Sequence, residues 1–329
     1  MGGFTLHVSP RITGSAGRHP LRRTAVLAGA LLLATACSSA RYPGPNPGPV
    51  PDGSMGPLPT SSPSPTTVPY GQTLESYIAP LSTALGQLTS AGSVTELGTA
   101  LAGAQQAASD GAQGLQGTDA PAEVADTHRQ LYVALDTLAT DLGTVQSDIG
   151  SSKVCATSSA LAETGQSQGL KDVTTALQAL STAGYTSTFT APQLPQPQQR
   201  ALKNGTWVRE GHDDGSGELT VDNTAGSTDA VLTLTKAGQS AYSFYVGKGQ
   251  STKVTGIEDG TYDIYFTGGT DWDDASKKFT EDCAFTKFQD SADYTTTNST
   301  YQTYTLTLTA SVGGNAQTNA VPPDTYPVP

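Results

Sequence analysis

Residues 121–150 read PAEVADTHRQLYVALDTLATDLGTVQSDIG, and this stretch decides the class of the first folded region. Its apolar side chains recur every three or four residues, which is the spacing of one face of an α-helix. A proline suits the first helical turn, because the N–H groups of that turn have no helical partner. We therefore predict one long amphipathic helix, whose apolar face carries Val124, His128, Leu131, Leu135, Leu138, Leu142, Val145 and Ile149.

The same spacing recurs on both sides of this helix. A capping sequence, Ser-Val-Thr-Glu, precedes one of the neighbouring stripes at residues 93–96. Pro80 lies inside another stripe, so we expect that helix either to start at Pro80 or to bend there. Four amphipathic helices on short connections bury their stripes as an antiparallel four-helix bundle, which we place at residues 71–185. The further stripes and a short helical piece lie at residues 74–88, 94–108, 155–164 and 170–180.

After a Pro/Gln-rich linker at residues 186–203, the period of the apolar side chains changes to two. Short alternating strands separated by turn signals are typical of an antiparallel β-sandwich, which we predict at residues 204–312. The polar, proline-bearing tail at 313–329 is predicted to be disordered. The fold class is therefore multidomain α + β. The alternating pairs and triplets are Leu219/Val221, Leu232/Leu234, Tyr242/Phe244/Val246, Tyr262/Ile264/Phe266 and Tyr304/Leu306/Leu308.

The N-terminal part predicts export. Residues 1–36 hold four arginines and no acidic residue, and an apolar run from Thr24 to Ala36 follows the arginines. This run is shorter than the roughly 20 residues that a spanning helix needs, so we predict a cleaved signal peptide. Residues 37–70 are rich in Pro, Gly and Ser, and they are predicted to form a disordered linker.

Two short motifs resemble known families. Ala34-Thr35-Ala36-Cys37 resembles the bacterial lipobox, which implies that Cys37 is acylated and holds the protein at the extracellular face of the cell membrane. Residues 254–266 resemble the Gly-x-Tyr hairpin of prealbumin-like domains, including the carboxypeptidase regulatory-like group. That second resemblance implies a non-catalytic adhesion or scaffold module.

Charge limits the partners. Cleavage before Cys37 removes four of the 17 basic residues and leaves 13 against 29 acidic residues, a net charge of −16. A surface this negative repels nucleic acid and anionic lipid headgroups. We therefore expect no nucleic-acid partner, and the membrane is expected to hold the protein through its lipid anchor.

The cysteines leave two alternatives open. If Cys37 is acylated, Cys155 and Cys283 remain as an even pair in a compartment that permits disulfides. Phe279, Cys283 and Phe285 share one face of a predicted strand, which points Cys283 at the core and favours a buried free thiol. The compartment favours an interdomain disulfide between Cys155 and Cys283. We prefer the free thiol and keep the disulfide as the alternative.

Candidate metal sites are few. His128 occupies a core position of the long helix, where a hydrogen-bonded polar layer is the preferred interpretation. His212 lies in a short polar segment that we interpret as a solvated loop. Asp271, Asp273 and Asp274 are a weak candidate for calcium, because they lack the loop pattern of a calcium-binding motif. We predict no cofactor and no bound metal.

Exposed aromatic side chains are the remaining signal. Alternate residues of a strand lie on opposite faces, and by this parity Tyr245 and Tyr265 lie on the face opposite to the apolar side chains of their strands. Trp272 lies in a polar segment. These three side chains could form a platform for a glycan or a protein partner, or an edge packed on the helices could bury them. Motifs of nucleophilic and metal-dependent enzymes are absent, so no catalytic residue is assigned.

We expect a non-enzymatic, membrane-anchored lipoprotein that binds an envelope protein or a wall polymer. The alternatives are a solute- or glycan-binding subunit and, third, a cell-wall hydrolase.

Overall fold

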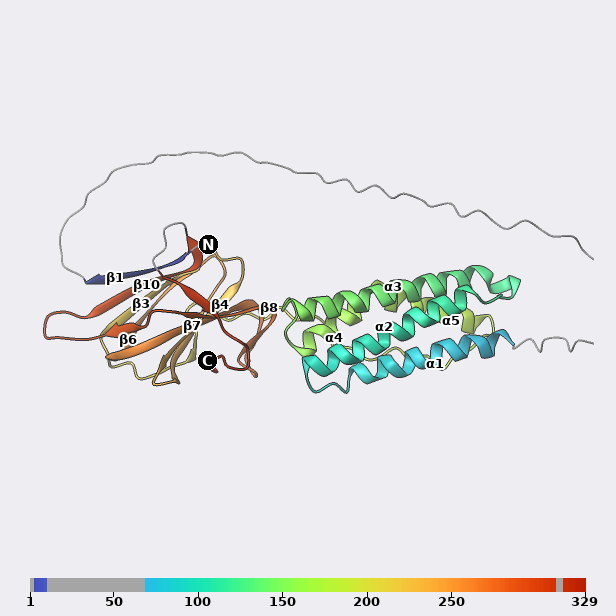
Figure 1. The fold of residues 1–329 in the computed structure, drawn as a ribbon, viewed down its shortest axis with the longest axis horizontal. Coiled ribbons are helices and arrows are strands. Elements are labelled where there is room, and N and C mark those ends of the chain that lie inside the picture. The colour runs from blue at the N-terminus through green and yellow to red at the C-terminus, as the bar shows by residue number, and fades with distance from the viewer. Residues whose placement is uncertain (1–2, 11–68, 312–315) are drawn as a thin grey trace, which may run out of the picture. The chain divides into compact units, whose positions relative to one another are not determined.

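The computed structural model describes residues 3–10, 69–311 and 316–329 (Figure 1). Cys37, most of the predicted signal peptide and the predicted N-terminal linker up to residue 68, here called the stalk, lie outside the described residues. Helices followed by largely antiparallel sheets make the chain mixed α + β, as predicted. Within the described ranges, no helix has both the length and the hydropathy needed to cross a membrane.

The helices confirm the apolar stripes. Every leucine and isoleucine of the stripe at 74–88 is fully buried, and α1 runs through Pro80 without ending there. Ser93 caps α2, because its hydroxyl accepts a hydrogen bond from the backbone N–H of Glu96. The helices are α1 (Tyr70–Leu88), α2 (Val94–Gln116), α3 (Ala125–Gly150), α4 (Thr157–Gln166) and α5 (Gln168–Thr182), with a 3₁₀ turn at Ala122–Val124.

The helices share one core of leucine and alanine. α2 packs against α1 and α3, and α3 packs against α5. The close approach of α3 and α5 depends on Gly169, since a Cβ at that position would lie 2.3 Å from the backbone nitrogen of Leu138. Part of the predicted linker belongs to this region, because the backbone N–H of Thr188 donates to the carboxylate of Glu75.

The strands form two sheets that share a second core. One sheet has the order β1-β10-β3-β6, and the other has the order β11-β8-β7-β4-β5-β2, with β9 paired to β7. The predicted alternating residues, from Leu219 to Leu308, are all buried, which confirms the period of two. The strands are β1 (Gly3–Pro10), β2 (Trp207–Arg209), β3 (Gly217–Asp222), β4 (Asp229–Lys236), β5 (Gln239–Val246), β6 (Ser251–Ile257), β7 (Gly260–Asp273), β8 (Lys278–Phe288), β9 (Ala292–Tyr294), β10 (Gln302–Ser311) and β11 (Thr318–Ala320).

Two pairings differ from the predicted antiparallel arrangement. β3 and β10 are parallel, which is allowed because no tight turn joins these strands. The expected hairpin at residues 254–266 is wrong, because β6 pairs with β3 in one sheet and β7 pairs with β4 in the other. The Asp259-Gly260 turn therefore carries the chain from one sheet to the other.

The first strand lies in the predicted signal peptide. β1 pairs antiparallel with β10, along a register that runs from Gly3 opposite Ser311 to Pro10 opposite Gln302. Cleavage before Cys37 would remove β1 and leave that edge of β10 without this neighbour.

The C-terminal tail is not disordered over residues 316–329, so that expectation is wrong there. β11 pairs with β8, and the ring of Tyr326 packs 5.2 Å from that of Phe285 and 5.9 Å from that of Tyr265. The hydroxyl of Ser240 donates to the carbonyl of Val328. Proline prevented a strand prediction here, but proline is compatible with an extended segment that crosses the face of a sheet.

Candidate functional site at the junction of the helical and sheet regions

Cys155 and Cys283 lie where residues 152–155 contact β8. The backbone N–H of Cys155 donates to the carbonyl of Thr280, and that of Cys283 donates to the carbonyl of Ser152, both over 2.9 Å. Val154 and Glu281 form an antiparallel bridge. The segment that follows α3 is therefore paired with β8, although it belongs to the helical half of the sequence.

Cys155 and Cys283 form a disulfide at this pairing, with Cα atoms 6.3 Å apart. The alternative of an interdomain disulfide is therefore confirmed, and the preferred free thiol is wrong. The parity argument correctly placed Phe279 and Cys283 on one face of β8, where they join a buried cluster with Tyr245 and Trp272. That cluster lies outside the core shared by the two sheets, so this face does not point at that core as expected, and no feature of the sequence indicated a second apolar face.

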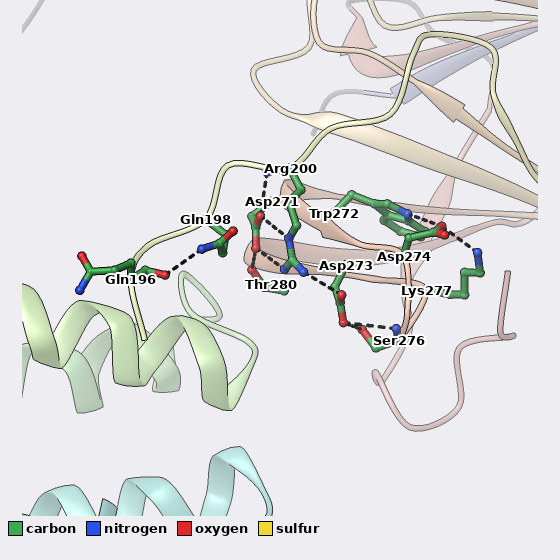
Figure 2. A network of polar contacts seen from close by, with 10 residues as sticks. All are labelled: Gln196, Gln198, Arg200, Asp271, Trp272, Asp273, Asp274, Ser276, Lys277 and Thr280. Carbon is green, nitrogen blue, oxygen red and sulfur yellow. Dashed lines mark hydrogen bonds and ion pairs between the residues drawn. The ribbon is translucent and has the colours of Figure 1, made fainter. Parts of the chain in front are cut away.

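A single arginine from the linker organises the aspartates at the end of β7 (Figure 2). The Nε and Nη2 atoms of Arg200 donate to the two carboxylate oxygens of Asp271 over 2.9 and 2.6 Å. Its Nη1 atom donates to Asp273 over 2.8 Å. The backbone N–H of Arg200 and the hydroxyl of Thr280 also donate to Asp271. Two-point pairing of this kind fixes the position and orientation of the linker.

Asp271 is the most constrained of these groups. Only 7% of its surface is exposed, and its backbone has φ 53°, a left-handed conformation that is uncommon outside glycine. The hydrogen bond from Arg200, opposed by burial and assisted by Thr280, lowers the pKa of Asp271 to about 2. The carboxylate therefore stays charged over the physiological range.

The other two aspartates have local partners. Asp273 accepts hydrogen bonds from the backbone and hydroxyl of Ser276. Asp274 pairs with Lys277 over 2.7 Å and accepts the indole N–H of Trp272. Cations and hydroxyls of the chain itself occupy these oxygens, which does not favour the calcium alternative. No cluster of three metal-binding side chains occurs among the residues that the structure describes.

The aromatic platform is also wrong. Tyr245 and Trp272 are each 1% exposed and pack with Phe279, and side chains from the linker side, Leu202 and Val208, lie against them. The linker is held there through backbone bonds, one of which joins the N–H of Trp272 to the carbonyl of Arg200. The outer face of this sheet is therefore covered, so opposite parity does not mean exposure.

Tyr265 does not belong to this cluster. It lies half-buried beside Tyr326, and Lys287 is 5.3 Å from the centre of its ring. The three proposed platform residues therefore do not form one surface.

His128 and His212 behave as predicted. His128 is 5% exposed, and its ring nitrogens lie 2.8 Å from the carbonyl oxygen of Leu115 and 2.9 Å from the hydroxyl of Tyr70. Burial, with a smaller effect of Tyr185, raises the pKa of Tyr70 to about 12. His212 lies in an exposed loop.

Two glutamates near the disulfide have raised pKa values. Burial, followed by the charge of Asp148, raises the pKa of Glu163, and burial followed by Asp271 raises that of Glu281. Raised carboxyl pKa values occur in acid catalysts and also in structural clusters. Here Glu281 is paired through its backbone to Val154, which gives it a structural position.

Arg200 is the residue that sequence reasoning missed. Between Lys171 and Lys203 it is the only basic residue, and no charged residue precedes it in the linker from residue 186 onward. An isolated cation of this kind, with an aspartate cluster elsewhere in the chain, was an available signal for a long-range ion pair. No protein-family model matches the chain, and the searches of curated proteins and of solved structures found no similar protein.

Proposed function

We propose that the protein is an exported lipoprotein whose acylated Cys37 holds a non-enzymatic binding or scaffold module at the outer face of the cell membrane. The observation that carries the proposal is the disulfide between Cys155 and Cys283. Disulfides persist in oxidising compartments, which agrees with export. The pair uses two of the three cysteines and leaves the sulfur of Cys37 free for a lipid.

The chemistry of the junction supports a role in presentation rather than catalysis. The disulfide, the paired backbone of residues 152–155 and the Arg200 contacts connect the helical region to the sheet region at several points. A stalk of about 30 residues would reach on the order of 90 Å in polyproline geometry. Such a stalk would hold a two-part module well beyond the lipid headgroups.

Metabolic labelling with an alkyne analogue of palmitate, followed by detergent phase partition, tests this proposal. We expect the wild-type protein to be labelled and to enter the detergent phase. Cys37→Ser should lose both properties, and the Cys155→Ser/Cys283→Ser control should keep both. Labelled protein that still contains residues 3–10, as shown by peptide mass spectrometry, would contradict cleavage before Cys37.

A further inference from the structure

Residues 321–329, here called the C-terminal strap, cross the outer face of the seven-stranded sheet. The strap begins at β8, where the N–H of Val321 donates to the carbonyl of Phe285, and it reaches β5, where Ser240 donates to the carbonyl of Val328. Its sequence, VPPDTYPVP, contains four prolines. Proline-rich segments are extended before they bind, and aromatic-lined grooves recognise them for that reason.

The face beneath the strap has such an aromatic lining. The ring of Tyr326 packs against Phe285 and Tyr265 at centroid distances of 5.2 and 5.9 Å. Phe285 belongs to β8 and Tyr265 to β7, so the two rings come from neighbouring strands. The contact therefore resembles the docking of a proline-rich peptide, with Tyr326 as its anchor.

The strap fills this face imperfectly. A cavity of 120 Å³ remains between strap and sheet, which forfeits dispersion contacts on both sides. The hydroxyl of Thr267 is buried without a hydrogen-bond partner, which costs free energy. Burial raises the pKa of Tyr326, although a hydrogen bond with Thr233 offsets part of this rise. A segment that filled the cavity and paired the hydroxyl of Thr267 would bind better than the strap.

Charge around the cavity indicates what kind of segment would fit. Lys277 and Lys278 line it from the sheet, and Asp324 lines it from the strap. Lys277 is paired with Asp274, and Lys287, which lies over the ring of Tyr265, is paired with Asp263. Lys278 has no ion pair among the described residues, so a segment that displaces the strap needs an acidic residue in the place of Asp324 to complement it.

We propose that the sheet face beneath the strap is a docking groove for an extended, acidic, proline-rich segment of a second polypeptide, which displaces the strap. The anchor ring of that segment takes the place of Tyr326 between Phe285 and Tyr265, and its acidic residue lies near Lys278. The strap acts as an intramolecular competitor that keeps the groove covered. This inference goes beyond the proposed lipoprotein function and does not depend on acylation.

Titration of the full chain with a fluorescent peptide of residues 321–329 tests the groove. Tyr326→Ala removes the anchor of the competitor, so we expect the peptide to bind this variant at least ten-fold more tightly than the wild type. The Tyr265→Ala/Tyr326→Ala protein should lose that gain, because it lacks half of the aromatic lining. A peptide with alanine in place of its tyrosine should not bind. Circular dichroism verifies that each variant is folded.

Three results would overturn the proposal. The first is no saturable binding to Tyr326→Ala, or equal affinity for that variant and the wild type. The second comes from hydrogen exchange: strap amides that stay equally protected in wild-type protein saturated with peptide would place the peptide elsewhere. The third concerns the source: residues 45–52, PNPGPVPD, share Pro-Val-Pro with the strap. If a peptide of residues 45–52 binds as tightly, the occupant is this chain's own stalk and not a second polypeptide.

Discussion

The helical region and the sheet region bury polar groups in different ways. The helical core is mainly leucine, alanine and valine, and the polar groups buried with it have partners: both ring nitrogens of His128, and the hydroxyl of Thr164, which donates to the carbonyl of Ala160. The sheet region buries several tyrosines, and the hydroxyls of Tyr242, Tyr262 and Tyr304 donate to backbone carbonyls. It also buries the charged Asp271. Helices satisfy their own backbone, whereas loops and strand ends leave carbonyl groups for side chains to pair.

This difference indicates which substitutions should lower the free energy of unfolding most in each region. Removal of a methylene group from the helical core costs packing, and the cost is local. Removal of one polar partner in the sheet region leaves the other partner buried and unpaired. The predictions below test this contrast, and they begin with the bond that connects the two regions.

The largest effect should follow loss of the disulfide in the Cys155→Ser/Cys283→Ser protein. The bond closes a loop with a sequence separation of 128, so its removal should lower the free energy of unfolding by about 4–5 kcal/mol in the chain-entropy account. Calorimetry should then show two transitions in place of one, because the helical core no longer unfolds together with the sheets. Cys37→Ser is the control and should leave the melting curve unchanged.

An intermediate effect concerns Asp271 and pH. Its folded pKa of about 2 lies below the ordinary value of 3.8, so the charged carboxylate stabilises the fold above pH 4, and this stabilisation is lost as pH falls toward 2. Because solvent partly screens the half-exposed guanidinium of Arg200, we expect about 1–2 kcal/mol. Chemical denaturation of wild type and Asp271→Asn between pH 2 and pH 7 measures the difference.

The wild-type advantage over Asp271→Asn should shrink steadily below pH 4. Asp274→Asn is the matched control, because this carboxylate is 65% exposed and its pairing with Lys277 lies in solvent. A gap between wild type and Asp271→Asn that stays constant down to pH 2 would show that the ion pair with Arg200 does not stabilise the fold.

The smallest effect compares two glycines that both have open space around a Cβ. Gly103 lies within α2, and Gly238 lies in the turn between β4 and β5 with φ 78°. Gly103→Ala should stabilise the protein by about 0.5–1 kcal/mol, because alanine favours helix. Gly238→Ala should destabilise it by about 1–2 kcal/mol, because an L-residue is strained there. Thermal unfolding of both variants measures the two changes in stability. Changes of the same sign would contradict the predicted difference between the two glycines.

Much of the helical region could be predicted from local sequence. A stripe such as Leu131 to Val145 has one solution, because the period of a helix is fixed by its own backbone hydrogen bonds. The strands were predictable in the same local sense, but their partners were not. The parallel pairing of β3 with β10 and the change of sheet after β6 involve residues far apart in the chain.

The candidate site was predicted as a set of residues and not as an arrangement. Cys155, Cys283 and the three aspartates were all identified in the sequence, yet the preferred free thiol was wrong. The missing element was Arg200, whose partners Asp271 and Asp273 lie more than 70 residues away in the chain. Parity placed Tyr245 on the outer face, and Trp272 was singled out by its polar segment, but neither observation could show that the linker covers these side chains.

The sequence by itself determined the stripes of the helices, the alternation of the strands and the acidic charge, and it predicts an export signal at residues 1–36. These properties depend on neighbouring residues, so they can be read without a fold. Only the tertiary structure decided which face of the seven-stranded sheet is covered, by the linker near Trp272 and by the strap near Tyr265. Burial depends on which distant segments pack together, and no local period specifies that.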